Sequence, residues 1–164
     1  MIPVYSIVGY SGTGKTTFLE KLIAELKARG IRLAVIKHDS HHFEMDKEGK
    51  DTWRFSQAGA DVVAIASKEK SAIIEHRTLE FSDVLKHIHN VDLILTEGYK
   101  HENHPKIAIY RAASGNALIG PPEEFFAIVT DTPFETDKPC FSLDDAAGVA
   151  DLIMKQEDTI YAQI

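Results

Sequence analysis

The chain has 164 residues, of which 44% are hydrophobic and 26% charged, proportions typical of a globular protein with one full core. Its formal net charge of −7 argues against a general nucleic-acid-binding protein, which would usually present a basic face. Cys140 is the one cysteine, so no intrachain disulfide can form and a reducing compartment is expected. We expect a single domain over residues 1–164, with no nucleic acid as a partner.

The first predicted strand begins at Ile2, which leaves no room for a signal peptide. No apolar run approaches the roughly 18 residues of a membrane span. We therefore expect a cytoplasmic protein that does not bind membranes.

A phosphate-binding loop is the first motif along the chain. Residues 9–16 read Gly-Tyr-Ser-Gly-Thr-Gly-Lys-Thr, which matches G-x-x-x-x-G-K-[ST]. The apolar run at residues 2–8 predicts a buried strand before the loop, and apolar residues at helical spacing from Phe18 to Leu26 predict a helix after it. Strand, glycine loop and helix are the context that this motif requires, so a chance match is disfavoured.

The residue types of the loop explain how it would bind a nucleotide. Glycines let successive N–H groups turn inward, and the helix beginning near Gly14 adds the positive end of its dipole. Lys15 can reach the β- and γ-phosphates, and the Thr16 hydroxyl is the expected Mg²⁺ ligand. The predicted nucleotide-binding residues of the loop are Gly9, Ser11, Gly12, Thr13, Gly14, Lys15, Thr16 and Thr17.

The rest of the chain alternates between strands and helices. Strands are predicted at residues 31–36, 62–66, 71–76, 91–96, 106–111 and 125–129, and helices at residues 51–58, 81–88 and 143–155. The short link between the strands at 62–66 and 71–76 favours an antiparallel pair. The pattern predicts an α/β fold with a mostly parallel sheet flanked by helices.

A second carboxylate near the metal is expected in phosphoryl chemistry on Mg²⁺. Glu97 follows the strand at 91–96, and Gly98 beside it would let the backbone approach a γ-phosphate. Asp39 follows the strand at 31–36, whereas Asp92 begins its strand and should lie at the opposite edge of the sheet. We predict a metal region of Thr16, Asp39 and Glu97, with Lys15 and Glu97 as the catalytic residues. Loop capping, or pairing of the two carboxylates with Lys37 or Lys100, is the alternative.

Four histidines suggest a second hypothesis. His38 and His41 are spaced H-x-x-H, as are His101 and His104, which would suit a zinc site. Both pairs lie in predicted loops without a cysteine nearby, so hydrogen bonding to an anionic ligand is favoured over zinc. Basic residues that could share this role are Lys37, Lys50, Arg54, Lys100 and Lys106, with surface solvation as an equal alternative.

Base recognition is weakly encoded. The N-K-x-D guanine signature is missing from the sequence. Asp131 follows a late strand, where its carboxylate could accept hydrogen bonds from guanine or cap the turn that begins there. Trp53 and Phe55 could stack on a ring, although core packing is the better interpretation.

Three blocks of the sequence resemble a known family. They are residues 9–17; then Lys37, His38, His41, Asp46, Gly49, Lys50, Asp51, Arg54 and Ala-Gly-Ala at 58–60; then Thr-Glu-Gly-Tyr-Lys at 96–100. Many P-loop proteins share the first block, whereas the second and third are much more specific. Together they are similar to the MobB family of molybdopterin-guanine dinucleotide biosynthesis proteins, over nearly the whole chain.

The resemblance implies a P-loop GTP-binding protein of the SIMIBI type, acting where GMP from GTP is joined to molybdopterin. It implies that a guanylyltransferase, MobA, carries out the joining. This chain would then be an accessory protein that binds GTP and Mg²⁺ and is at most a slow GTPase, with molybdopterin as a further candidate ligand. It also implies a homodimer whose sheet extends between subunits. The residues implied to face the pterin or a partner are Lys37, His38, His41, Lys50, Asp51, Arg54 and Lys100.

Two other functions compete with this one. A small-molecule kinase using ATP would need an acceptor site and usually an arginine-rich lid, and arginine occurs here at 29, 32, 54, 77 and 111 without a cluster. A nucleotide-dependent metallochaperone would use the four histidines named above. Nucleotide preference separates the first two functions, and metal content tests the third.

Overall fold

The computed structural model describes residues 2–39 and 43–161. The chain packs as two compact units, one of Met1–His38 with Asn90–Ile164 and one of Asp39–His89. The single domain over residues 1–164 stays a prediction. Among the helices of the described ranges, none combines the length and the apolar character needed to cross a bilayer.

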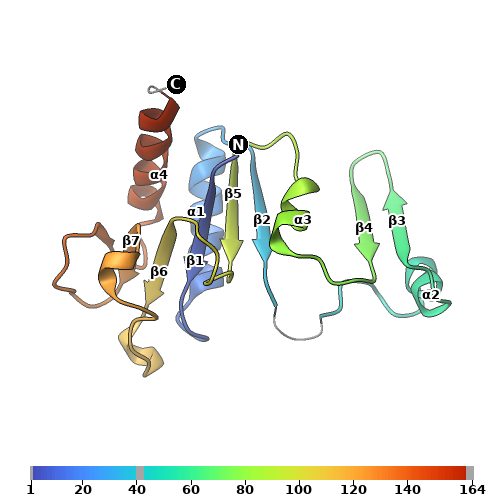
Figure 1. Cartoon of the computed structure of the whole chain (residues 1–164), viewed down its shortest axis with the longest axis horizontal. Helices are drawn as coiled ribbons and strands as arrows, with labels where there is room; N and C mark the ends of the chain where they lie inside the picture. The colour runs from blue at the N-terminus through green and yellow to red at the C-terminus, as the bar shows by residue number, and fades with distance from the viewer. Residues whose placement is uncertain (1, 40–42, 162–164) are drawn as a thin grey trace. The chain divides into compact units, whose positions relative to one another are not determined.

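A parallel sheet forms the centre of the first unit (Figure 1). Its strands are β1 (Val4–Val8), β2 (Leu33–Lys37), β5 (Leu93–Glu97), β6 (Lys106–Tyr110), β7 (Ala127–Thr130) and β8 (Cys140–Phe141). Within the described residues of this unit the order is β2-β5-β1-β6-β7-β8, and each neighbouring pair is parallel. The predicted α/β fold with a mostly parallel, helix-flanked sheet is confirmed. Because β1 lies between β5 and β6, the segments that follow these three strands meet at one edge of the sheet.

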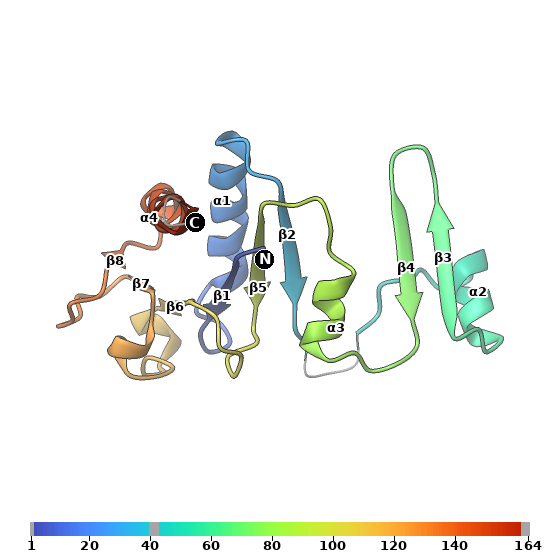
Figure 2. The ribbon, with the colours of Figure 1, turned by 45° about the horizontal axis from the view of Figure 1, so that its top comes forward.

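Two helices cover one face of this sheet. These are α1 (Lys15–Ala28) and α4 (Ala146–Tyr161), which lie side by side (Figure 2). Leu22 of α1 and Val149 of α4 are fully buried with Ile7 of β1 and Ile107 of β6 in one core cluster. Burying an aliphatic side chain of this size contributes about 1.5–3 kcal/mol. The core thereby holds the start of α1 directly beyond the end of β1.

The opposite face carries a smaller cluster of Val8, Ala108, Phe125 and Ile128. Two short 3₁₀ helices, η1 (Ala112–Ser114) and η2 (Pro122–Glu124), lie between β6 and β7 in the sequence.

The second unit is built around a two-stranded antiparallel sheet. It comprises β3 (Val62–Ala66) and β4 (Ser71–Glu75), with α2 (Asp51–Gln57) and α3 (Phe81–Lys86). The predicted antiparallel pairing is confirmed, with Val62 opposite Glu75 and Ala66 opposite Ser71.

Element boundaries differ from the sequence prediction where local contacts compete with the strand pattern. Both β2 and β5 begin two residues later than predicted, because Arg32 and Asp92 pair with each other just before them. The last helix begins at Ala146 rather than at residue 143, since Oδ1 of Asp145 accepts a hydrogen bond of 2.9 Å from the N–H of Gly148. It also extends to Tyr161, six residues beyond the predicted end at residue 155.

Candidate nucleotide-binding site

The phosphate loop closes on one of its own carbonyl groups. The ammonium of Lys15 and the hydroxyl of Thr13 each donate to the carbonyl oxygen of Tyr10 at 2.9 Å. Gly14 has a left-handed conformation, φ 91°, directly before α1. Lys15 is the first residue of α1, and its ammonium is held against the loop. The helix N-terminus at the same place also has a positive potential.

The close packing of the loop against β6 requires glycine at position 9. A Cβ atom there would lie 2.6 Å from the carbonyl oxygen of Ile109 and 2.9 Å from Oγ1 of Thr13. Neither distance is compatible with a real side chain. The pairing of β1 with β6 therefore sets the path by which the loop leaves the sheet.

Thr16 and Glu97 come together at the carboxyl edge of the sheet. The Thr16 hydroxyl lies 3.2 Å and 3.1 Å from the two carboxylate oxygens of Glu97. The strand register sets Glu97 beside Ile7 of β1 and beside Lys37 of β2, which places it next to the phosphate loop. Both side chains offer the hard oxygen ligands that Mg²⁺ prefers, so they fit this metal. Their metal and catalytic roles stay predictions.

A larger protein-built metal centre is not present in the described part of the chain, where no group of three or more His, Cys, Asp or Glu residues could hold an ion. Mg²⁺ in nucleotide sites is commonly held by one or two protein groups together with phosphates and water, so it does not need such a group. Of the four histidines in the zinc hypothesis, His41 lies outside the described residues.

A tight turn follows Glu97 and packs against His38, the residue after β2. The N–H of His38 donates to the carbonyl oxygen of Glu97 at 2.9 Å, and the rings of His38 and Tyr99 lie 4.8 Å apart. A Cβ on Gly98, which has φ +97°, would lie 3.1 Å from the Cβ of His38. Burial raises the pKa of Tyr99, and the charge of Glu102 adds to the effect. Glycine at 98 thus permits β2 and the turn to pack closely.

The residues predicted to face a pterin or partner are divided between the two units. Lys37, His38 and Lys100 belong to the first unit. Lys50, Asp51 and Arg54 belong to the second, as does the predicted metal ligand Asp39, and His41 lies outside the described residues. The structure thus brings Thr16 and Glu97 together, whereas the role of this wider set stays a prediction.

Asp131 follows β7, and its carboxylate contacts the loop that follows β6. Its Oδ1 accepts hydrogen bonds from the N–H of Ala112 at 2.9 Å and from the hydroxyl of Thr132 at 3.1 Å. These bonds, led by the one from Ala112, lower the pKa of Asp131. Its backbone contact is thus with the first residue of η1 rather than with the turn that begins at Asp131, so turn capping stays a prediction. Guanine recognition stays a prediction.

Arg111 is a further candidate site residue, which the sequence alone did not single out. Its Nη2 lies 3.5 Å from the position of a Cβ on Gly14, with Cζ and Nε both at 4.0 Å. The guanidinium also interacts electrostatically with the carboxylates of Asp131 and Asp144, which compensate part of its charge. A positive charge next to a helix N-terminus suits an anionic ligand. The sequence signal was its place at the end of the strand at 106–111. This position indicates the phosphate loop only because β6 is the neighbour of β1 in the sheet.

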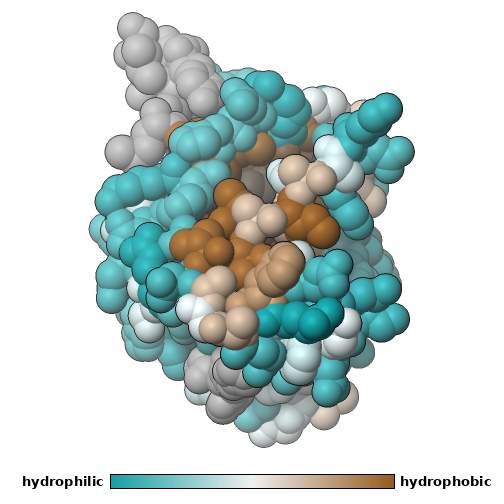
Figure 3. Space-filling model, turned by 90° about the vertical axis from the view of Figure 1, so that its right-hand side faces the viewer, coloured by the Kyte–Doolittle hydropathy of each residue, from teal (hydrophilic) through white to brown (hydrophobic). Residues whose placement is uncertain are grey.

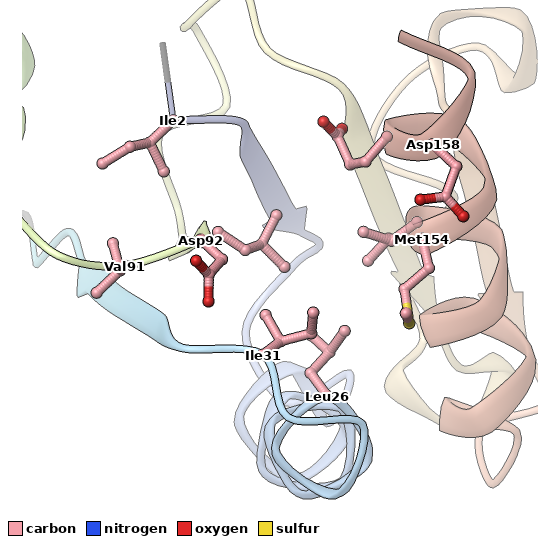
Figure 4. A pocket seen from close by; sticks show the side chains of 10 residues that line it. Ile2, Leu26, Ile31, Val91, Asp92, Met154 and Asp158 are labelled. Atoms are coloured by element: carbon pink, nitrogen blue, oxygen red, sulfur yellow. The ribbon is translucent and has the colours of Figure 1, made fainter. Parts of the chain in front are cut away.

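A separate cavity of about 570 Å³ lies where the strands begin (Figure 4). Its wall combines apolar side chains such as Leu26 with the carboxylates of Asp92, Glu157 and Asp158. As its position at the start of β5 predicts, Asp92 lies away from the phosphate loop, and it pairs with Arg32 at 2.7 Å. Carboxylates would repel a triphosphate, so this cavity does not suit the nucleotide.

Comparison with known proteins places these features in a family. Residues 4–131 match the family model MobB, described as molybdopterin guanine dinucleotide synthesis protein B. The chain is 42% identical over 161 residues to the molybdopterin-guanine dinucleotide biosynthesis adapter protein of Haemophilus influenzae, covering 93% of this chain and 88% of that protein. It is 37% identical over 167 residues to the Escherichia coli protein of the same name, covering 94% and 93%.

Solved structures of MobB proteins are also similar to this chain. The crystal structure of Bacillus subtilis MobB has a TM-score of 0.77 and 29% identity, covering 94% of this chain and 98% of that one. The MobB homolog from Bacillus stearothermophilus has a TM-score of 0.67 and 27% identity, covering 95% and 98%. The family match includes both the phosphate loop and the turn after β5, so the family resemblance of the sequence is confirmed and this chain belongs to the MobB family.

Proposed function

We propose that this chain is an adapter protein of molybdopterin-guanine dinucleotide biosynthesis that binds GTP and Mg²⁺ at the phosphate loop. The relatives from H. influenzae and E. coli are named as adapter proteins of this synthesis, and membership of the family supports the same role here. The observation that carries the nucleotide part is the contact of Thr16 with Glu97 beside the loop.

The chain's own residues would mainly bind and orient the nucleotide. Backbone N–H groups of the loop and the ammonium of Lys15 would bind the phosphates, while Thr16 and Glu97 would hold Mg²⁺. When bound, Mg²⁺ neutralises charge on the phosphate oxygens. Intrinsic P-loop GTPases without an added arginine finger turn over at rates on the order of 10⁻⁴ to 10⁻² per second. The proposed role is therefore to hold GTP for a guanylyltransferase partner, MobA, with slow hydrolysis as a side activity.

Calorimetric titration of the Lys15→Ala variant with Mg²⁺ and a non-hydrolysable GTP analogue tests this proposal. Loss of a charge-assisted contact to phosphate should weaken binding about 10- to 100-fold. Lys27→Ala, near the other end of α1, is the matched control and should bind as the wild type does. Equal affinity in the Lys15→Ala variant and the wild type would refute the phosphate-loop assignment.

We also propose that the protein forms a homodimer through the β3–β4 hairpin. An isolated two-stranded sheet is at best marginally stable in water. Here Val62, Ile65 and Ile73 are 54%, 57% and 65% exposed. Figure 3 shows hydrophobic side chains gathered in a patch on the face that it views. An exposed apolar strand pair of this kind favours pairing with a second chain.

Sedimentation measurements test the dimer. Ile65→Lys places a charge on the exposed surface of β3 and should shift the protein towards monomer. Thr78→Lys adds the same charge outside the strands and should leave the mass unchanged. A monomeric wild type, or an Ile65→Lys variant that keeps the dimer mass, would contradict this interface.

A further inference from the structure

The cavity where the strands of the parallel sheet begin is separate from the nucleotide site. Its volume of about 570 Å³ is within the range of about 300–1,000 Å³ that is common for small-molecule sites. The wall is formed by the segments at the starts of β1, β2 and β5 and by α1 and α4, all within the first unit. The phosphate loop follows the end of β1, at the opposite edge of the sheet, so the two sites do not overlap.

One face of α4 contributes a thioether and two carboxylates to the cavity wall. Met154, Glu157 and Asp158 occupy positions i, i+3 and i+4 of the helix, which lie on the same side. In Figure 4, Met154 and Asp158 lie on one side of the cavity, and Ile2 and Val91 lie on the other. The cavity therefore has both apolar and negatively charged surface.

The apolar part of the wall is accessible to a ligand. Ile31, Val91 and Met154 line the cavity, and each is only partly buried. Leu26 and Ile153, which also line it, are fully buried members of the core and keep the wall in place. Methionine adapts its shape to different partners. An apolar ring or chain that covers these side chains would gain about 25 cal/mol for each Å² of apolar surface removed from water.

The carboxylate of Glu157 is held in position by the protein core. Its Oε1 accepts a hydrogen bond of 2.6 Å from the hydroxyl of Tyr5, which is 1% exposed and packs edge-on against Phe126. Burial, together with the bond to Glu157, raises the pKa of Tyr5, so the phenol stays protonated and remains the donor. The carboxylate thus has a fixed orientation before any ligand binds, which lowers the entropic cost of binding.

The second oxygen of Glu157 is open to a ligand. Across residues 2–39 and 43–161, Oε2 of Glu157 has no hydrogen-bond partner, yet it is not buried and keeps contact with solvent. An accessible carboxylate oxygen accepts a strong, charge-assisted hydrogen bond from an ammonium group. The cavity therefore contains one oriented anionic acceptor beside apolar surface.

The charges around the cavity select a cation. Asp92 is paired with Arg32 at 2.7 Å, and the charge of Lys27 also acts on it. Glu157 and Asp158 form no ion pair with any described residue, and the described lining includes neither Lys nor Arg. Asp158 lies in the last turn of α4, where the helix dipole adds negative potential. An anion would be repelled, whereas a cation would meet two uncompensated carboxylates.

We infer that this cavity binds a small organic cation, in which an ammonium group is joined to a compact apolar ring or chain. The ammonium donates to Oε2 of Glu157, and the apolar part covers Ile31, Val91 and Met154. This site goes beyond the proposed function, because it uses neither the phosphate loop nor Mg²⁺.

Phenethylamine, 2-phenylethanol and ethylamine test the two parts of the site on the wild-type chain. Phenethylamine has a cation and an apolar ring, 2-phenylethanol keeps the ring without the charge, and ethylamine keeps the charge without the ring. Titrations followed by NMR of the methionine methyl groups give the dissociation constants. Phenethylamine should shift the Met154 signal and bind at least about tenfold more tightly than either of the others. The signal of Met45, in the second unit, is the internal control and should not move.

The variant Glu157→Gln removes the charge and keeps the shape of the side chain. Its amide oxygen can still accept from Tyr5, so the unfolding temperature should stay within a few degrees of the wild type. Phenethylamine affinity should fall about 10- to 100-fold, while 2-phenylethanol affinity stays the same. Glu20→Gln removes the same charge from an exposed position of α1 outside the cavity, and it should bind phenethylamine as the wild type does.

Three results would overturn the inference: an unchanged Met154 signal with phenethylamine, equally tight binding of 2-phenylethanol or ethylamine, or equal phenethylamine affinity in Glu157→Gln and the wild type. The ligand comparison uses the wild type, so it decides the matter even if the variant does not fold. Lys15→Ala separates this site from the phosphate loop. It should lose the GTP analogue and keep phenethylamine, so failure of one proposal leaves the other intact.

Discussion

Thr16 and Glu97 are 81 positions apart in the sequence, yet the hydroxyl of one donates to the carboxylate of the other at 3.1–3.2 Å. The contact exists because β5 pairs with β1, which brings the end of β5 beside the start of α1. The proposed nucleotide site depends on this pairing.

Glu97→Gln keeps the size of the side chain but removes its charge. Mg²⁺-dependent GTP hydrolysis should therefore fall about 10- to 100-fold, with a matching rise in the Mg²⁺ concentration needed for half-maximal rate. Glu123→Gln, on the exposed η2, is the control and should behave as the wild type does. Full Mg²⁺-dependent hydrolysis in the Glu97→Gln variant would show that the assigned role is wrong.

Arg111→Ala removes the guanidinium that lies against Gly14. Affinity for the GTP analogue should fall about tenfold or more, because a charge-assisted contact to the anion is lost. Arg111→Lys keeps the positive charge and should recover part of this affinity. Calorimetry measures both variants, and an unchanged affinity in Arg111→Ala would mean that the guanidinium has no part in nucleotide binding.

Gly9→Ala introduces a methyl group within 2.6 Å of the Ile109 carbonyl oxygen. Either the loop or β6 must shift, so we expect a loss of about 1–3 kcal/mol in the free energy of unfolding, together with weaker nucleotide binding. Gly30→Ala is the control, since nothing lies within 4 Å of its Cβ position and its φ is +81°. It should cost about 1 kcal/mol through backbone conformation and leave nucleotide affinity unchanged. Equal nucleotide affinity in both variants would show that Gly9 does not contribute to nucleotide binding.

The Arg32–Asp92 pair should affect acid stability. Hydrogen bonds from Arg32 lower the pKa of Asp92 to about 2, below the unfolded value of about 3.9. A carboxylate with a lowered pKa stabilises the fold above its unfolded pKa, and this contribution is lost as the pH falls through its folded pKa. Thermal unfolding should therefore show a loss of stability between about pH 4 and pH 2 that is smaller in Asp92→Asn. Identical pH curves for the two proteins would contradict this.

The sequence predicted the parts of the fold that local patterns specify. The phosphate loop, the hairpin and the alternation of strands and helices were all visible in residue spacing. The position of Glu97 at the end of a buried strand was also predictable, because an apolar run and a following glycine are local signals.

Other features depend on contacts between distant segments. The strand Cys140–Phe141 has two residues, too few to show a period of two. Arg111 became a site residue only through the neighbouring position of β6 and β1. The sequence around Asp46 showed no sign that one of its carboxylate oxygens is buried, because burial is set by how the segment packs rather than by its own residues.

Titration calorimetry of one preparation, first with Mg²⁺ and a non-hydrolysable GTP analogue and then with the matching ATP analogue, tests the central claim most directly. We expect clear preference for the guanine nucleotide, and this preference should weaken in Asp131→Asn if that carboxylate hydrogen-bonds to the base. Preference for the adenine nucleotide, or none, would contradict the GTP-binding adapter and favour a kinase that uses ATP.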